Sequence, residues 1–128
     1  MNKDNINQSP PEWCFQRELR LTTAPDYSAV FRAPQRASHS GITILYRCNQ
    51  KDHARLGLAI AKKQFKRAVD RNRLKRLIRE SFRQSSIRHS NVDLVVMMKA
   101  HVVHMNNSKI IQLLEKQWKK IQASLNTA

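Results

Sequence analysis

The run VDLVVMMK, residues 92–99, constrains the fold more than any other stretch of this 128-residue sequence. It is nearly continuous in apolar residues and has the length of one β-strand, so a strand here carries apolar side chains on both faces. Such a strand is typical of the centre of a sheet that is covered on both sides. We therefore expect a layered α+β domain with this strand at the centre of its sheet.

The periodicity of the first half predicts one helix and two strands. Residues 23–33 have the pattern of a short helix with Thr23 as its cap, and residues 34–41 that of a loop. Residues 42–47 and 55–61 alternate between polar or small and larger apolar side chains, as strands do. The short polar stretch that joins them predicts an antiparallel hairpin.

Two longer helices complete the order helix, strand, strand, helix, strand, helix. The first is basic and ends near residues 83–86. The second has Asn107 or Ser108 as its cap. One apolar face identifies it, formed by Ile110, Ile111, Leu114, Trp118 and Ile121.

The chain length suits a single domain. We expect this domain to cover residues 13–122, with a flexible polar arm over 1–12 and a tail over 123–128. Cys14 and Cys48 are far apart and form no C-x-x-C pair, which favours two reduced thiols in a cytosolic protein. We find no signal-peptide pattern and no apolar run of membrane-spanning length, so a cytoplasmic location is expected.

The net charge limits the class of partner. Lys and Arg together number 24 against nine Asp and Glu, which gives a formal net charge of +15. A domain this small and this basic repels itself unless an anion neutralises it. Nucleic acid is the first candidate partner, an anionic membrane surface is the second, and a freely soluble basic protein is the least favoured alternative.

The basic helix concentrates this charge. A helical wheel of residues 71–83 has a cationic arc and an opposite arc of apolar or small side chains. The second arc consists of Leu74, Leu77, Ile78, Ser81 and Phe82. Residues 62–83 hold ten basic and two acidic residues, too few acids for mutually supporting pairs. Because the apolar arc must face the core, we expect the cationic arc to point outward and bind an anion. A membrane-surface helix would expose its apolar face to lipid, so nucleic acid is favoured.

The sequence shows no catalytic apparatus. The acidic residues are scattered, which argues against metal-dependent nuclease chemistry. None of the five His has an obvious catalytic partner, and His101 and His104 fit the end of a strand better than a metal site. A strand rather than a short helix precedes the basic helix, which argues against a helix-turn-helix. Charge alone leaves the choice between DNA and RNA open.

Several motifs in sequence order resemble a known family. RLGLAIAKK, residues 55–63, followed by AVDRNRLKRLIRESFR, residues 68–83, closely resembles the protein subunit of bacterial ribonuclease P. The segments FQRELRL, DYSAVF and VDLVVMMK extend the resemblance over about residues 13–122. The resemblance implies a four-stranded α/β sandwich with an unusual left-handed crossover, although nearly all such connections are right-handed.

The function that the resemblance implies is that of an accessory subunit. The catalytic RNA of that bacterial endoribonuclease removes the 5′ leader of precursor tRNA, with Mg²⁺ bound mainly by RNA. The protein would bind this RNA and the leader, without membrane contact. We infer no obligate protein partner and predict no particular metal site on the protein. A basic ribosomal protein, which would only scaffold RNA, and a nucleoid-type DNA-binding protein are the alternatives.

The resemblance also implies which residues contact RNA. The motif helix and the segment entering it would lie against the catalytic RNA through Lys62, Lys63, Lys66, Arg67, Arg71, Asn72, Arg73, Lys75, Arg76, Arg79 and Arg83. Tyr27 and Phe31 match the aromatic positions of a cleft for the single-stranded leader, with core packing an equal alternative for Phe31. Strand parity adds a floor to this cleft, made of Thr43, Leu45, Ala59 and Ala61.

Overall fold

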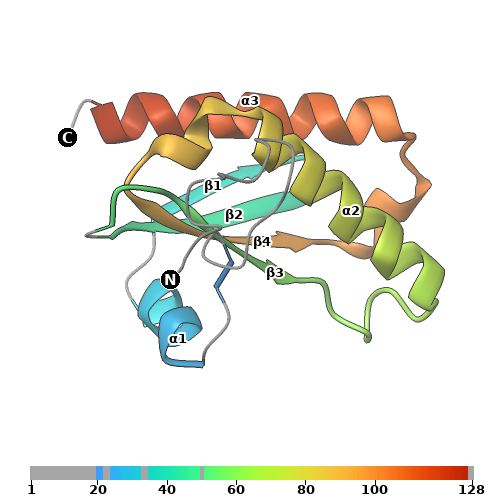
Figure 1. Cartoon of the computed structure of the whole chain (residues 1–128). Helices are drawn as coiled ribbons and strands as arrows, with labels where there is room; N and C mark the ends of the chain where they lie inside the picture. The colour runs from blue at the N-terminus through green and yellow to red at the C-terminus, as the bar shows by residue number, and fades with distance from the viewer. Residues whose placement is uncertain (1–19, 22–23, 33–34, 50, 127–128) are drawn as a thin grey trace, which may run out of the picture.

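A mixed four-stranded β-sheet forms the centre of the domain (Figure 1). The strands stand in the order β1-β2-β4-β3; β2 is antiparallel to both of its neighbours, whereas β3 and β4 are parallel. Their bounds are β1 Gln35–His39, β2 Ile42–Cys48, β3 Arg55–Ala59 and β4 Val92–Met98. The computed structural model describes residues 20–21, 24–32, 35–49 and 51–126; the predicted arm over 1–12 and the predicted cap Thr23 lie outside the described residues.

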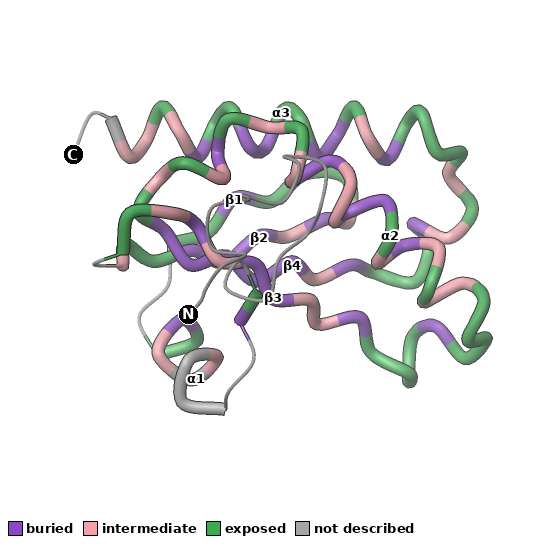
Figure 2. Tube along the Cα trace, viewed as in Figure 1, coloured by how far each residue is buried: buried purple, intermediate pink, exposed green. Residues whose placement is uncertain are grey.

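Helices cover both faces of this sheet. The helices α2, Ala68–Gln84, and α3, Asn107–Asn126, lie on one face, and α1, Ala24–Arg32, lies on the other (Figure 1). In Figure 2 the buried parts of α2 and α3 are those turned toward the sheet. The predicted α+β class, with four strands and three helices, is therefore confirmed.

The strand β4 lies at the centre of the sheet, as its two apolar faces predict. Leu94 and Val96 are fully buried in the large core beneath α2 and α3. Val95 points to the opposite face and is fully buried in a smaller cluster with Leu21, Val30 and Leu45 beneath α1. The two cores on either side of β4 fix α1 and α2 on opposite faces of one sheet.

The helix α2 packs on the sheet through the predicted arc. Its buried residues are the five that the helical wheel gathers, Leu74, Leu77, Ile78, Ser81 and Phe82. Ser81 is the polar member, and its hydroxyl accepts a hydrogen bond from the indole nitrogen of Trp118 at 2.8 Å. The rings of Phe82 and Trp118 meet edge to face with centroids 5.9 Å apart, which joins α2 to α3.

The predicted hairpin between residues 42–47 and 55–61 is wrong. β4 lies between β2 and β3, because a strand with two apolar faces buries them best with a strand on each side. The hairpin instead joins β1 to β2 through Ser40 and Gly41. Both have positive φ, 51° and 88°, which is the geometry of the two-residue turns that match the twist of a hairpin.

The loop predicted over residues 34–41 is also wrong, since residues 35–39 form β1. The sequence of this strand, QRASH, lacks the apolar alternation of a typical strand, and Ala37 is its one buried residue. Such a polar composition is tolerated because β1 is an edge strand of the sheet.

The ends of the other elements differ slightly from the sequence expectations. β3 ends at Ala59 rather than at residue 61, and α3 runs to Asn126, so residues 123–126 continue the helix instead of forming a tail. The cap of α3 is Asn106, whose side-chain oxygen accepts a hydrogen bond from the backbone N–H of Lys109 at 2.8 Å. The parallel pair β3 and β4 makes α2 a crossover helix; its left hand stays a prediction. No helix within the described ranges is both long and apolar enough to cross a membrane.

Candidate nucleic-acid interface

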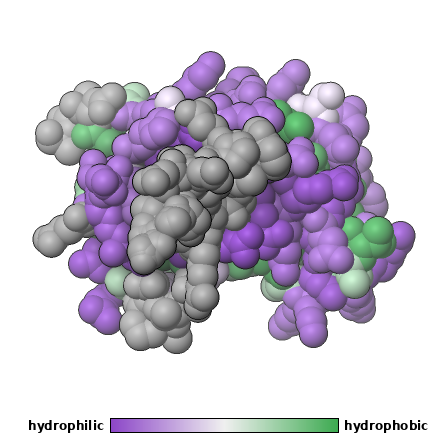
Figure 3. All heavy atoms as spheres, viewed as in Figure 1, coloured by the Kyte–Doolittle hydropathy of each residue, from purple (hydrophilic) through white to green (hydrophobic). Residues whose placement is uncertain are grey.

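The outer side of α2 is rich in cations. Asn72 and Arg76 are exposed, and Lys75, Arg79 and Arg83 are half-buried along the flanks of the helix. Hydrophilic side chains dominate the coloured surface of the face in Figure 3, on which α2 lies. Over the described parts of the chain, Lys75, Arg76 and Arg79 form no hydrogen bond or ion pair. These three side chains are therefore available to an external anion.

The guanidinium of Arg73 is turned into the protein, contrary to the prediction that the whole cationic arc points outward. Its Nη2 donates to the carbonyl of Met105 at 2.6 Å and its Nη1 to the carbonyl of Val103 at 3.2 Å. Its Nε donates to the side-chain oxygen of Asn107 at 2.9 Å. Arg73 thus ties α2 to the chain that leads into α3.

The guanidinium of Arg71 is also used within the protein. Its Nη1 donates to the carbonyl of Phe65 at 2.7 Å and to that of Lys66 at 3.0 Å. The side chain of Phe65 is buried in the main core. The segment before α2 is therefore held both by this burial and by the hydrogen bonds from Arg71. The outward orientation predicted for Arg71 and Arg73 is therefore wrong, because backbone carbonyls compete with solvent for their donors.

The anchored segment presents further cations to solvent. Lys62, Lys63 and Lys66 are all exposed, and they surround the buried Phe65 in sequence. Arg67 is exposed too, and its Nε lies 3.7 Å from a carboxylate oxygen of Asp70. An exposed pair of this kind contributes little to stability. The predicted basic residues of the segment are therefore exposed directly before the start of α2.

A row of half-buried residues lies on the other face of the sheet, the face against which α1 packs. The pairing of β2, β4 and β3 places Thr43, Met97 and Ala59 in one row across the three strands, and all three are half-buried. The next row, Leu45, Val95 and Gly57, is buried. Thr43 and Ala59 thus share the expected floor, whereas Leu45 is covered. Ala61 is exposed beyond the end of β3.

Met97 is the floor residue that the sequence reasoning missed. Its parity in the run at residues 92–99 is that of Val95, so the same strand pattern that placed Thr43 and Ala59 could have found it. Both Met97 and Ala59 pack against the cluster beneath α1. The floor is therefore continuous with the small core that holds α1.

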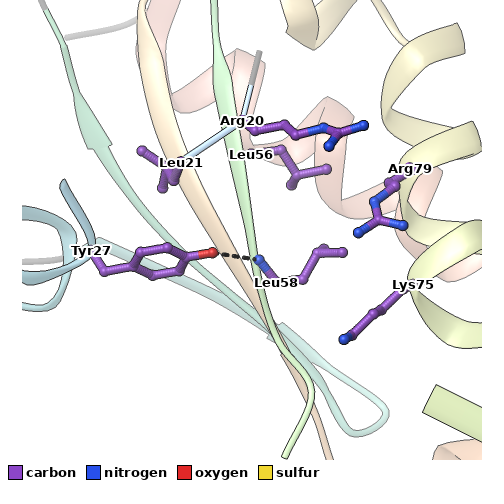
Figure 4. Close-up of a pocket in the computed structure, with 7 residues that line it drawn as sticks. All are labelled: Arg20, Leu21, Tyr27, Leu56, Leu58, Lys75 and Arg79. Carbon is purple, nitrogen blue, oxygen red and sulfur yellow. Dashed lines mark hydrogen bonds between the residues drawn. The ribbon is translucent and has the colours of Figure 1, made fainter. Parts of the chain in front are cut away.

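The two predicted aromatic residues of α1 have different environments. Phe31 is 44% exposed, which excludes the alternative that it is an ordinary core residue. Tyr27 lies across β3, where its hydroxyl oxygen accepts a hydrogen bond from the backbone N–H of Leu58 at 3.3 Å (Figure 4). A Cβ atom at position 57 would stand 2.7 Å from the ring of Tyr27, so Gly57 is what lets the ring lie there.

Tyr27 also lines a hollow of about 150 Å³ at the edge of β3. Apolar side chains of Leu21, Leu56 and Leu58 line it as well, and its charged members are Arg20, Lys75 and Arg79. Burial, and secondly the positive charge of Arg20, lower the pKa of the Arg79 guanidinium. Within the described part of the chain, no three His, Cys, Asp or Glu side chains form a group that could hold a metal ion.

Comparison with known proteins agrees with this geometry. A family model described as Ribonuclease P matches residues 15–122. Ribonuclease P protein components of Histophilus somni and Haemophilus influenzae are 47% and 50% identical to the chain, each over 83% of this chain and 89% of the relative.

Solved structures of the same kind superpose on the fold. The ribonuclease P protein of Staphylococcus aureus has a TM-score of 0.72 and 27% identity, with 80% of this chain and 94% of that chain covered. That of Thermotoga maritima has a TM-score of 0.66 and 26% identity, with 76% and 96% covered. Because these matches extend over most of the chain rather than over one motif, the chain belongs to the ribonuclease P protein family, the accessory protein subunits of that tRNA-processing enzyme.

Proposed function

We propose that the protein binds the catalytic RNA of ribonuclease P through α2 and the single-stranded 5′ leader of precursor tRNA through the groove beside α1. The observation that carries this proposal is the placement of two different surfaces on opposite faces of one sheet. One is the cationic outer side of α2, and the other is the face that carries α1, with half-buried Thr43, Met97 and Ala59 and the exposed aromatic residue Phe31. Such a protein can hold the catalytic RNA and its substrate at the same time.

The contacts to the catalytic RNA are electrostatic in this proposal. The exposed side chains are those of Lys62, Lys63, Lys66, Arg67, Asn72 and Arg76, and the half-buried ones are those of Lys75, Arg79 and Arg83. Cations that neutralise phosphates release counterions, so the affinity falls steeply as salt rises. Arg71 and Arg73 support this surface by fixing the segment before α2 and the start of α3.

The groove beside α1 suits a leader of variable sequence. Phe31 offers an exposed aromatic face, and aromatic stacking contributes about 1–3 kcal/mol per base with little dependence on the base. The floor consists of Thr43, Met97 and Ala59, whose side chains are small or flexible. Such side chains can contact any of the four bases. The groove therefore favours single-stranded RNA in general.

The chemistry of leader removal belongs to the RNA in this proposal. Mg²⁺ bound mainly by the catalytic RNA would supply the chemistry of phosphodiester hydrolysis. The protein contributes by positioning the two RNA molecules, and the site of this work is the cytoplasm, where tRNA precursors are processed.

Reconstitution tests the proposal. The protein is mixed with a catalytic ribonuclease P RNA and precursor tRNA at low Mg²⁺, and we expect faster removal of the leader than with the RNA alone. A protein that binds both RNAs but leaves the rate unchanged would act as a structural RNA-binding protein, and the proposal would be rejected.

Tyr27→Ala tests the leader groove separately. Loss of the ring at the edge of β3 should weaken binding of precursor tRNA about tenfold, since stacking of one base contributes that much. Binding of mature tRNA, which lacks the leader, should stay at the wild-type value. Equal losses for precursor and mature tRNA would contradict the assignment of the groove to the leader.

A further inference from the structure

We propose that Arg20, Lys75 and Arg79 form a binding subsite for one phosphate of the leader strand, at the outer edge of β3. This inference rests on the proposed function and adds a residue from the segment before α1. The subsite would mark the place where the leader RNA passes from the α1 side of the sheet to α2. The ligand chemistry is a phosphodiester of single-stranded RNA, for which inorganic phosphate is the minimal probe.

The outer edge of β3 is where the two faces of the molecule meet. β3 has β4 on one side only, so the backbone groups on its other side need different partners. The N–H of Leu21 donates to the carbonyl of Leu56 at 2.9 Å, and the hydroxyl of Tyr27 accepts from the N–H of Leu58. Arg20 pairs with Leu56 as a single parallel bridge, which places it on this edge.

The cations converge on the hollow from two elements. In Figure 4 Arg20 extends from the edge of β3 toward α2, whereas Arg79 and Lys75 extend from α2 toward β3, so all three reach the same hollow. Lys75 and Arg79 are four residues apart on α2 and hence share one face of the helix. Burial, and secondly the charge of Arg20, lower the pKa of the Arg79 guanidinium, and an anion bound in the hollow would stabilise its charged form.

The lining of the hollow selects a nucleotide phosphate. Guanidinium groups donate paired hydrogen bonds to phosphate oxygens, and the ammonium of Lys75 adds a point charge. The hydroxyl hydrogen of Tyr27 can donate as well, because the Tyr27 oxygen is the acceptor in its bond with the N–H of Leu58, and no acceptor for that hydrogen lies among the described residues. The leucine side chains and the ring of Tyr27 provide an apolar wall for a sugar or a base.

The leader is the better source of this phosphate than the catalytic RNA, so Lys75 and Arg79 would contact the leader while the other cations of α2 contact the catalytic RNA. Tyr27 lines the hollow and, like Ala59 and Met97, packs against the cluster beneath α1, so a base stacked on that side brings the neighbouring phosphate within reach of Arg20 and Arg79. The hollow has a volume of about 150 Å³ and therefore admits a single phosphate group rather than the width of a double helix.

Inorganic phosphate gives the first test. The Nε–Hε signals of arginines in ¹⁵N NMR spectra report on their side chains, and Arg36 of β1, at the opposite edge of the sheet, is the matched control. At constant ionic strength we expect saturable shifts of the Arg20 and Arg79 signals with one common Kd. The Arg79 shift should be lost in Arg20→Gln and kept in Arg36→Gln. Small linear shifts shared by Arg36 would show general screening and would overturn the subsite.

RNA binding distinguishes the sources of the phosphate. For the full-length protein with the catalytic RNA, Arg20→Gln should weaken precursor tRNA binding about tenfold relative to Arg36→Gln, the loss expected for a charge-assisted contact. The salt slope of precursor binding should fall by about 0.7. Mature tRNA and the catalytic RNA should bind both variants equally, and Arg20→Lys should recover part of the loss. A loss for the catalytic RNA with unchanged precursor binding would overturn the leader assignment.

This design separates the two proposals. Stimulated leader removal with equal behaviour of Arg20→Gln and Arg36→Gln would reject the subsite and keep the proposed function. Saturable phosphate binding by a protein that never stimulates leader removal would reject the proposed function and keep the phosphate site, with a different RNA as its source.

Discussion

Two groups of cations on the same helix have different partners. Near the start of α2, Arg71 and Arg73 give their donors to carbonyl groups and to one side-chain amide of the protein. One turn later, Lys75, Arg76 and Arg79 have no hydrogen-bond or ion-pair partner in the described ranges. A dense cationic motif can thus combine arginines that hold the fold together with cations that are left to bind RNA. Substitution should distinguish the two groups.

Arg73→Ala should have the largest effect on stability. The change removes three hydrogen bonds from a charged donor and leaves two half-buried carbonyls without it, so the free energy of unfolding should fall by about 2–4 kcal/mol. Chemical denaturation measures this, with Arg76→Ala as the control that loses the same charge on the same helix. An equal, small effect of both substitutions would contradict the structural role of Arg73.

Arg71→Ala should have a smaller and more local effect. Two hydrogen bonds to the segment before α2 are lost, and we expect the free energy of unfolding to fall by about 1–2 kcal/mol because Phe65 still anchors the segment. Amide hydrogen exchange should become faster over residues 62–67 while the exchange of β4 changes little. Uniformly faster exchange through the sheet would argue against a local anchor.

Arg76→Ala should leave stability within about 0.5 kcal/mol of the wild type, the smallest effect of the three. Its side chain is exposed and has no partner in the part of the chain that the structure describes. The same denaturation series checks this. A loss as large as that of Arg73→Ala would mean that Arg76, too, is held within the fold.

The sequence predicted those parts of the fold that local periodicity determines. The five buried residues of α2 follow from the helical repeat, and the central place of β4 follows from its two apolar faces. The pairing of the strands was missed because β4 enters between β2 and β3 from far along the chain. β1 was missed because an edge strand with one buried residue carries almost no apolar pattern.

The candidate site was predictable in composition and less so in orientation. Lys75, Arg76 and Arg79 follow from the outer arc of the helix. The inward turn of Arg73 could not be foreseen, since its acceptors are backbone carbonyls 30 and 32 residues away. Arg20 was overlooked for a similar reason: only the bridge to Leu56 brings it beside α2.

The salt dependence of binding to the catalytic RNA tests the division of α2 most directly. The slope of log affinity against log salt counts the phosphates that the protein neutralises. We predict that Arg76→Ala reduces the magnitude of this slope by about 0.7–0.9, whereas folded Arg73→Ala keeps the wild-type slope. A reduced slope for Arg73→Ala together with a wild-type slope for Arg76→Ala would contradict the account.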